Sequence, residues 1–174
     1  HSRSSRQGRS HQNHKISQMS DMDFLARAIE LSKKSLTDEP GGPFGAVIVK
    51  DGKVISEGWN EVTSTNDPTA HAEMQAIRKA GKVMGDFRLA GAVIYSSCEP
   101  CPMCLAAIYW ARIERVVYAN SRTDAARIGF DDAYIYAQLS LDVVKREIPC
   151  LHLPSLPAQA VFEAWAQKAD KKAY

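Results

Sequence analysis

The sequence lacks the long apolar segments of a membrane protein. No apolar run approaches the roughly 20 residues needed to span a bilayer, and the polar start of the chain contains no apolar region of a secretory signal. These absences exclude a membrane-spanning protein and favour a cytoplasmic location, where thiols stay reduced.

Cysteine and histidine are scarce and unevenly distributed. Three of the four cysteines lie in "SSCEPCPMC" (residues 96–104), and three of the five histidines lie within residues 1–20. In a reducing compartment so few cysteines indicate metal binding or catalysis more than a disulfide framework. Beyond the first 20 residues, His71 and His152 are the only imidazoles that could join the cysteines in a metal site.

Positive charge is concentrated at the start of the chain. Residues 1–20 hold four of the 22 basic residues and no acid, which leaves 18 basic and 20 acidic residues, a net charge of −2, in the rest. We expect residues 1–20 to be a disordered tail and a cloning leader, with Met19 as the natural start. The alternative for this tail is a nucleic-acid-binding arm. Residues 21–174 are expected to form a single domain, and it has no basic stripe that would follow the phosphates of a nucleic acid.

Hydrophobic periodicity divides residues 21–174 into helices and strands. Helices are expected at 20–36, 69–84, 102–113 and 156–174, and strands on both sides of a turn within 44–60 and at 90–97, 114–120 and 142–149. Strands that alternate with helices predict an α/β fold with helices on both faces of one sheet.

Turn and cap residues mark the ends of these elements. The Asp51-Gly52 pair is a strong hairpin signal, and Pro102 suits the first position of a helix. The first helix has Asp21 and Asp23 as candidate caps. In the second helix, Thr69 lies near the expected N-cap and a glycine, at position 81 or 85, near the end.

Cys101 and Cys104 are spaced so that both thiols can face one ion at the start of a helix. The unpaired N–H groups at that end favour thiolates. A zinc site takes Cys, His and carboxylate ligands, and a catalytic one leaves a position to water. We expect His71, at the start of another helix, to be the third ligand. His152 lies in a late apolar stretch, where a structural or surface role is the better interpretation.

Glu73 follows His71 too closely to be a second ligand on the same helical face, but it could reach water bound to the metal. His71-Ala-Glu73 and Pro100-Cys101-Pro-Met-Cys104 match the H-x-E … P-C-x-x-C spacing of zinc-dependent nucleobase deaminases. Zinc would lower the pKa of its water to about 7. Glu73 would take a proton from that water and deliver it to the leaving amine.

The same cysteines could serve a redox pair or a structural zinc site. A C-x-x-C pair in a cytosolic α/β protein can be thioredoxin-like, and Cys98 could be the fourth ligand of a non-catalytic zinc-binding interaction module. Glu73 favours a catalytic site, because a structural site needs no carboxylate beside an open position. Cys98 is then a packed thiol, and Cys150, in an apolar stretch, is expected to be buried.

Five further segments extend the pattern: "GGPFGAVIV", "NDPTAHAE", "SCEPCPMCLAAIYWARI", "TDAARIGFDDAYIY" and the terminal "KKAY". Together they resemble the small bacterial guanine deaminases of the cytidine-deaminase superfamily, from about residue 22 to the end of the chain. The zinc motif identifies only the superfamily, whereas "GFDD" and the terminal aromatic residue point to the guanine branch.

This resemblance implies a three-layer α/β/α fold with a five-stranded mixed sheet. It implies one Zn²⁺ per subunit and hydrolytic deamination of guanine to xanthine and ammonia, in purine catabolism or salvage. It also implies a homodimer whose C-terminal segment is exchanged between the subunits. The expected partners are a purine base and a second copy of the chain, with no membrane and no nucleic acid.

The resemblance also implies a set of substrate-binding residues: Phe44, Asn60, Ala72, Asp132 and Tyr174. Phe44 would stack on the purine and Asn60 would hydrogen-bond to the ring. Asp132 would accept N–H protons that guanine has and adenine lacks, since a buried carboxylate left without its donor is costly. Tyr174 would close the pocket, which is the partner's pocket if the C-terminal segment is exchanged.

Each of these positions also has an ordinary structural explanation. Phe44 could belong to the core at the start of a strand, and Asn60 could be a turn residue. Asp131 and Asp132 could cap a helix, and a terminal tyrosine usually frays. Asp124 is a competing acid for the role of Asp132, although it too suits a helix cap.

Within the superfamily, the alternatives are a guanosine deaminase and a tRNA adenosine deaminase. A capping terminal tyrosine would reduce the room for a ribose. The slightly acidic domain and the absence of a basic C-terminal helix speak against an RNA substrate, because phosphate contacts dominate RNA affinity.

Overall fold

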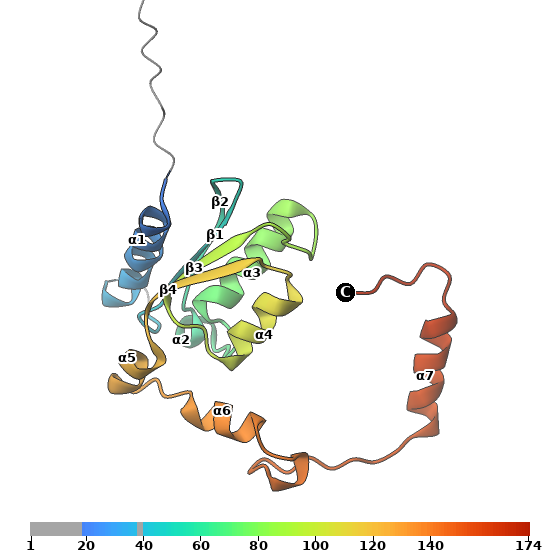
Figure 1. Cartoon of the computed structure of the whole chain (residues 1–174). Coiled ribbons are helices and arrows are strands. Elements are labelled where there is room, and N and C mark those ends of the chain that lie inside the picture. Colours follow the sequence, from blue (N-terminus) through green and yellow to red (C-terminus); the bar gives the residue numbers. More distant parts are fainter. Residues whose placement is uncertain (1–18, 38–39) are drawn as a thin grey trace, which may run out of the picture.

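The computed structural model describes residues 19–37 and 40–174, and a mixed four-stranded sheet lies at its centre (Figure 1). The strands are β1 (Gly45–Lys50), β2 (Lys53–Trp59), β3 (Val93–Cys98) and β4 (Arg115–Asn120), in the order β2-β1-β3-β4. Strand β1 is antiparallel to β2 and β3, and β3 is parallel to β4. The predicted tail, apart from its last two residues, lies outside the described residues.

The hairpin between β1 and β2 is the one expected from Asp51-Gly52. Both residues have positive φ, 51° and 74°, as a type I′ turn requires at its two central positions. Lys50 pairs with Lys53 across this turn.

Helices cover both faces of the sheet and bury two separate cores (Figure 1). Helix α1 (Asp21–Ser32) packs Phe24 and Leu31 against one face, with Val47 of β1 and Tyr95 of β3. Helices α3 (Ala72–Met84) and α4 (Pro102–Trp110) cover the other face. The predicted three-layer arrangement is therefore confirmed.

The ends of these helices follow the predicted signals only in part. Pro102 opens α4, and Gly85 ends α3 in the left-handed conformation. The N-cap of α1 is Ser20, whose hydroxyl accepts from the Asp23 N–H while the Asp23 carboxylate accepts from the Ser20 N–H. The N-cap of α3 is His71, two residues beyond the predicted Thr69.

The prediction of a fifth strand at 142–149 is wrong. This segment contains the short 3₁₀ helix η2 (Val143–Lys145) and otherwise irregular backbone. Its two consecutive valines are followed by Lys145, Arg146 and Glu147. A strand here would therefore have charged side chains on both faces, so little packing would favour adding it to the sheet beside β4. Cys150, predicted to be buried, is exposed.

Residues after β4 form an arm that leaves the layered body (Figure 1). It contains α5 (Arg122–Arg127), α6 (Ala133–Leu139) and α7 (Leu156–Gln167). No residue of these three helices is buried. The remaining short elements are η1 (Lys33–Leu36) and α2 (Val62–Thr65). None of the helices in the described part of the chain has the length and apolar character needed to cross a membrane.

Gly58 allows α3 to lie directly on β2. A Cβ at this position would collide with the Ala72 carbonyl oxygen and would lie 2.7 Å from the Ala76 nitrogen. Ala72, Ala76 and Ala80 are fully buried along the facing side of the helix. Close approach of the helix to the strand therefore depends on small side chains on both surfaces.

We expect Gly58→Ala to lower the free energy of unfolding by about 1–3 kcal/mol, because the added methyl pushes α3 away from β2. Urea unfolding of the zinc-loaded protein measures this change. The matched control is Gly81→Ala within α3, where an added Cβ meets only ordinary contact at 3.5 Å. This control should gain about 0.5–1 kcal/mol from helix propensity. Equal stability of the two variants would contradict the close packing described here.

Candidate metal centre

The ligands predicted from the sequence meet where α3 and α4 begin. Strands β2 and β3 are both antiparallel to β1, so they run in the same direction, and the helices that follow them start at the same edge of the sheet. His71 is the N-cap of α3 and Cys101 the N-cap of α4, and neither side chain makes a capping hydrogen bond. Cys104 lies in the first turn of α4 and is fully buried.

The spacing of these three side chains fits a zinc ion. His71 Nδ1 lies 3.5 Å from the sulfur of Cys101 and 3.5 Å from that of Cys104, and the three ligand atoms lie within 4.8 Å of one another. Zn–S bonds of about 2.3 Å and Zn–N bonds of about 2.0 Å at tetrahedral angles place sulfur and nitrogen about 3.5 Å apart. Three protein ligands leave the fourth position open, as in catalytic zinc sites.

The two thiols are tightly coupled. The pKa of Cys101 is lowered to about 4, first by a hydrogen bond from Cys104 and then by His71. The pKa of Cys104 is raised, because that thiol donates to Cys101 and is buried beside it. The pKa of His71 is raised by its hydrogen bond with Cys101. A bound dication would stabilise both thiolates.

Glu73 lies beside this cluster without belonging to it. Its side chain is 6% exposed, and burial raises the pKa of its carboxyl. The charges of Cys101 and His71 both act on it. A buried carboxyl with a raised pKa next to an open metal position can both take up and release a proton.

The other candidate metal ligands, and the acid that competes with Asp132, lie away from the cluster or already have a hydrogen-bond partner. The Cys98 thiol donates to the Ser121 carbonyl at 3.8 Å, and burial raises its pKa to about 11, so it is a neutral packed thiol outside the cluster. His152 is exposed in the arm. Asp124 forms a capping box with Ser121, its carboxylate accepting from the Ser121 N–H at 2.9 Å.

Phe44 and Asn60 lie at the same edge of the sheet as the cluster. The Asn60 N–H donates to the Phe44 carbonyl at 3.2 Å, and the next residue, Glu61, donates to Ala70 just before α3. Asn60 is buried, and its Oδ1 accepts from the Gly42 and Val62 N–H groups.

Ala72 is the first residue of α3 and is fully buried. The N–H groups of a first helical turn have no acceptor within the helix, so its backbone offers a donor next to His71.

The two acids of "GFDD" have different surroundings. The Asp131 carboxylate accepts from the Ala133 N–H at 2.9 Å. Asp132 is the N-cap of α6, yet its side chain makes no capping hydrogen bond. Burial raises the pKa of Asp132 and Arg122 lowers it, while the charge of Cys101 raises it further. Asp132 is therefore a free, half-buried carboxylate within electrostatic reach of the cluster.

Tyr174 lies at the opposite ends of α3 and α4 from the cluster. Its ring centroid is 5.8 Å from that of Trp110, at the end of α4, and 6.3 Å from that of Phe87, just after α3. In this conformation of a single chain, Tyr174 does not lie at the metal centre of its own subunit.

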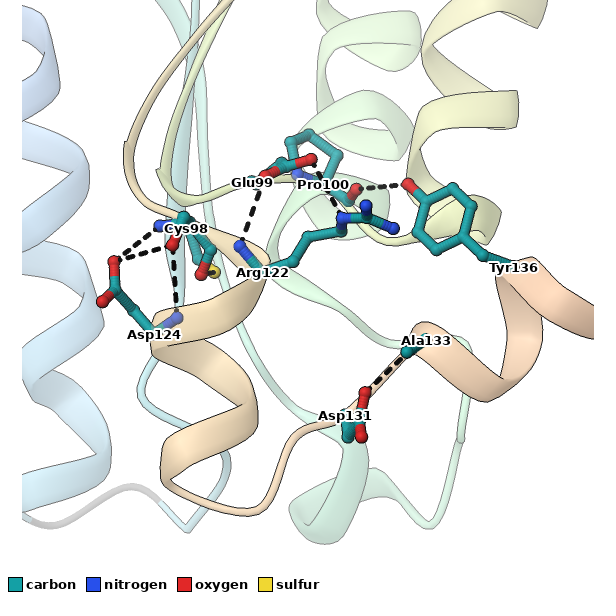
Figure 2. A network of polar contacts seen from close by, with 9 residues as sticks. Cys98, Glu99, Pro100, Arg122, Asp124, Asp131, Ala133 and Tyr136 are labelled. Atoms are coloured by element: carbon teal, nitrogen blue, oxygen red, sulfur yellow. Dashed lines mark hydrogen bonds and ion pairs between the residues drawn. The ribbon is translucent and has the colours of Figure 1, made fainter.

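Two residues near the site were missed from the sequence. The Phe130 ring packs edge-to-face on Phe44 with centroids 5.0 Å apart, and Arg122 contacts both the loop before Cys101 and helix α6 (Figure 2). Phe130 belongs to the "GFDD" segment, directly before the two acids, and this place is the signal that the sequence offers for it. For Arg122 the sequence carries no signal, because its partners are distant in the chain.

Comparison with known proteins gives a consistent result. Residues 18–120 match the cytidine and deoxycytidylate deaminase zinc-binding region. The chain is 51% identical to guanine deaminase of Bacillus subtilis over 90% of its own length and all of that protein. The crystal structure of that enzyme superposes with a TM-score of 0.87, covering 90% of this chain and 99% of the other. A tRNA-specific adenosine deaminase of Buchnera aphidicola is 43% identical over 64% of this chain and 74% of its own.

We expect Cys104→Ser to lose most of the bound zinc and Cys98→Ser to keep it, because only Cys104 belongs to the ligand cluster. Zinc content measured by mass spectrometry after dialysis of the purified variants tests this. Both variants replace a buried cysteine by serine, so Cys98→Ser is the control for effects of the substitution that do not involve the metal. Equal zinc loss in both variants would mean that Cys98 is a ligand.

Proposed function

The chain belongs to the cytidine and deoxycytidylate deaminase family, and we propose that it hydrolyses guanine to xanthine and ammonia. The observation that carries this proposal is its 51% identity to a guanine deaminase over the whole length of that enzyme. The likeness to a tRNA-specific adenosine deaminase covers a smaller share, 64%, of the chain.

The reaction replaces the exocyclic amine on C2 of guanine by oxygen from water. Zinc held by His71, Cys101 and Cys104 would polarise the attacking water. Glu73 takes a proton from this water at its carboxylate and delivers it to the departing amine, which leaves as ammonia. The raised pKa of Glu73, which is caused by its burial, suits a group that must hold and then release a proton.

Asn60, Ala72 and Phe44 are proposed to hold the purine at the metal. Because Asn60 Oδ1 already accepts from two backbone N–H groups, its amide NH₂ is left to donate to an acceptor on the ring. The backbone N–H of Ala72 would donate from the start of α3. Phe44 would stack on the base, with its ring supported by Phe130.

Asp132 is proposed to identify guanine. Its carboxylate makes no capping hydrogen bond and could accept N–H protons that guanine presents and adenine lacks. Adenine would leave this half-buried carboxylate without its hydrogen-bond donors. Because an unpaired polar group in a site is costly, this difference would favour guanine strongly over adenine.

We infer further that the active protein is a homodimer that exchanges the arm and holds one zinc per subunit. Helix α7 buries no residue, and Phe162 and Val161 are 81% and 65% exposed. An isolated amphipathic helix of 12 residues is only marginally stable in water, so the apolar side of α7 needs a surface to cover it. In an exchanged dimer, Tyr174 would cap the partner's site. A cytoplasmic location suits ligand thiols that must stay reduced.

Glu73→Gln is expected to keep its zinc and lose about 10²–10⁴-fold in turnover, because the amide cannot shuttle the proton. Ammonia release from guanine is measured for the parent and the variant, with guanosine, adenine, cytosine and a tRNA anticodon stem in parallel. Turnover of guanine alone supports the proposed substrate, and turnover of the RNA alone overturns it. Loss of zinc from Glu73→Gln would refute its role as a non-ligand.

Mixed dimers test the exchange of the arm. A chain lacking residues 171–174 and a full-length Glu73→Gln chain should each be poorly active. If Tyr174 caps the partner's site, their co-expressed heterodimer regains activity, since the intact Glu73 and the intact C-terminus then serve one site. If each chain caps its own site, the heterodimer is no more active than its parents.

A further inference from the structure

Helix α6 carries Asp132 but has little contact with the body of the protein. No residue of α6 is buried, and residues 128–131 before it and 140–145 after it are exposed. The place of Asp132 relative to the metal ligands therefore depends on a few specific contacts. One is the edge-to-face packing of Phe130 on Phe44. The others converge on Arg122 (Figure 2).

Arg122 joins the loop before Cys101 to α6. Its backbone N–H donates to Glu99 Oε1 at 3.2 Å, and its Nε lies 3.4 Å from Glu99 Oε2. Its guanidinium lies over the Tyr136 ring of α6, 4.1 Å from the centroid. The Tyr136 hydroxyl donates to the Pro100 carbonyl at 3.5 Å, directly before Cys101. Figure 2 shows the guanidinium between Glu99 and Tyr136.

Each of these contacts is weak alone, because Arg122 is 43% exposed and Glu99 27% exposed. Together, however, these contacts can fix the position of α6 relative to the loop before Cys101. The backbone of Arg122 is fixed at the start of α5, where Ser121 and Asp124 form the capping box, and Glu99 is fixed by its N–H bond to the Asn120 carbonyl at 2.8 Å. The planar guanidinium thus presents a rigid surface on which Tyr136 can rest.

We propose that Arg122 is a positioning residue that holds Asp132 at a fixed place relative to the metal loop. It contacts none of the metal ligands; it acts through α6, and its positive charge also faces Asp132. This inference rests on the proposed function for its effect on guanine, but its structural part does not. Loss of Arg122 leaves the metal cluster and Glu73 in place and lets α6 move, so binding of the base should suffer more than the chemical step.

The test compares Arg122→Ala with Arg127→Ala, which removes an exposed arginine from the same helix. Arg127 pairs with Asp124 three residues away and is 72% exposed. Arg122→Ala should keep its zinc and change kcat little. It should raise KM for guanine by about tenfold, the order expected when a hydrogen bond to a charged group is weakened. Arg127→Ala should behave like the parent. Tyr136→Leu, which keeps a helix-forming residue in α6, should reproduce the rise in KM. Arg122→Lys should rescue only part of it, since lysine keeps the charge and lacks the planar group.

A double-mutant cycle shows whether Arg122 acts through Asp132. Arg122→Ala should cost little further kcat/KM when Asp132 is already Asn, because the group it positions is then gone. Additive losses would overturn the proposal, as would an unchanged KM for Arg122→Ala with the parent active on guanine.

Hydrogen exchange separates this proposal from the proposed function. Amides of residues 133–139 should lose protection in Arg122→Ala and not in Arg127→Ala, whatever the substrate is. If the parent is inactive on guanine while this loosening occurs, the proposed substrate is wrong and the anchoring role of Arg122 is supported. Unchanged protection would overturn the anchoring role.

Discussion

The site depends on two helix N-termini that must meet around one cation. Each helix carries its positive dipole end at this place, so the dipoles alone oppose a metal ion. Two thiolates, those of Cys101 and Cys104, supply the compensating negative charge, and both come from the start of α4. The residues at the two N-cap positions, His71 and Cys101, face each other across the cluster and make no capping hydrogen bond. The first turns of both helices thus give up their usual caps to form the ligand set.

Much of this arrangement could be predicted from short-range signals. The Asp51-Gly52 turn, Pro102 at the start of a helix and the spacing of the ligand motif each act over a few residues, and each was found where it was expected. Predicting that the two motifs come together needed only the alternation of strands and helices, since helices that follow parallel strands start at one edge of the sheet.

The errors came from segments whose structure depends on contacts distant in the chain. The apolar residues of 142–149 resemble a strand locally, yet this part of the chain leaves the sheet after β4. The choice of Asp132 over Asp131 came only from the resemblance, because no local signal in the sequence separates the two acids. Both are acids before a helix, and only the backbone decides that Asp131 bonds the Ala133 N–H while Asp132 remains available. Arg122 was overlooked because it meets Glu99 and Tyr136 only after folding.

Pro102 affects how the site binds its metal ion. A residue before proline is restricted to extended conformations, and Cys101 has φ of −68° and ψ of 171°. Proline also brings no N–H to the helix start, which removes one positive dipole from the surface that a cation must approach. Pro102 therefore keeps the backbone of Cys101, a metal ligand, extended in the unfolded chain as well as in the folded one. Binding of the ion would then cost less conformational freedom than with a flexible residue at 102, so the proline would strengthen the affinity of the site for its metal.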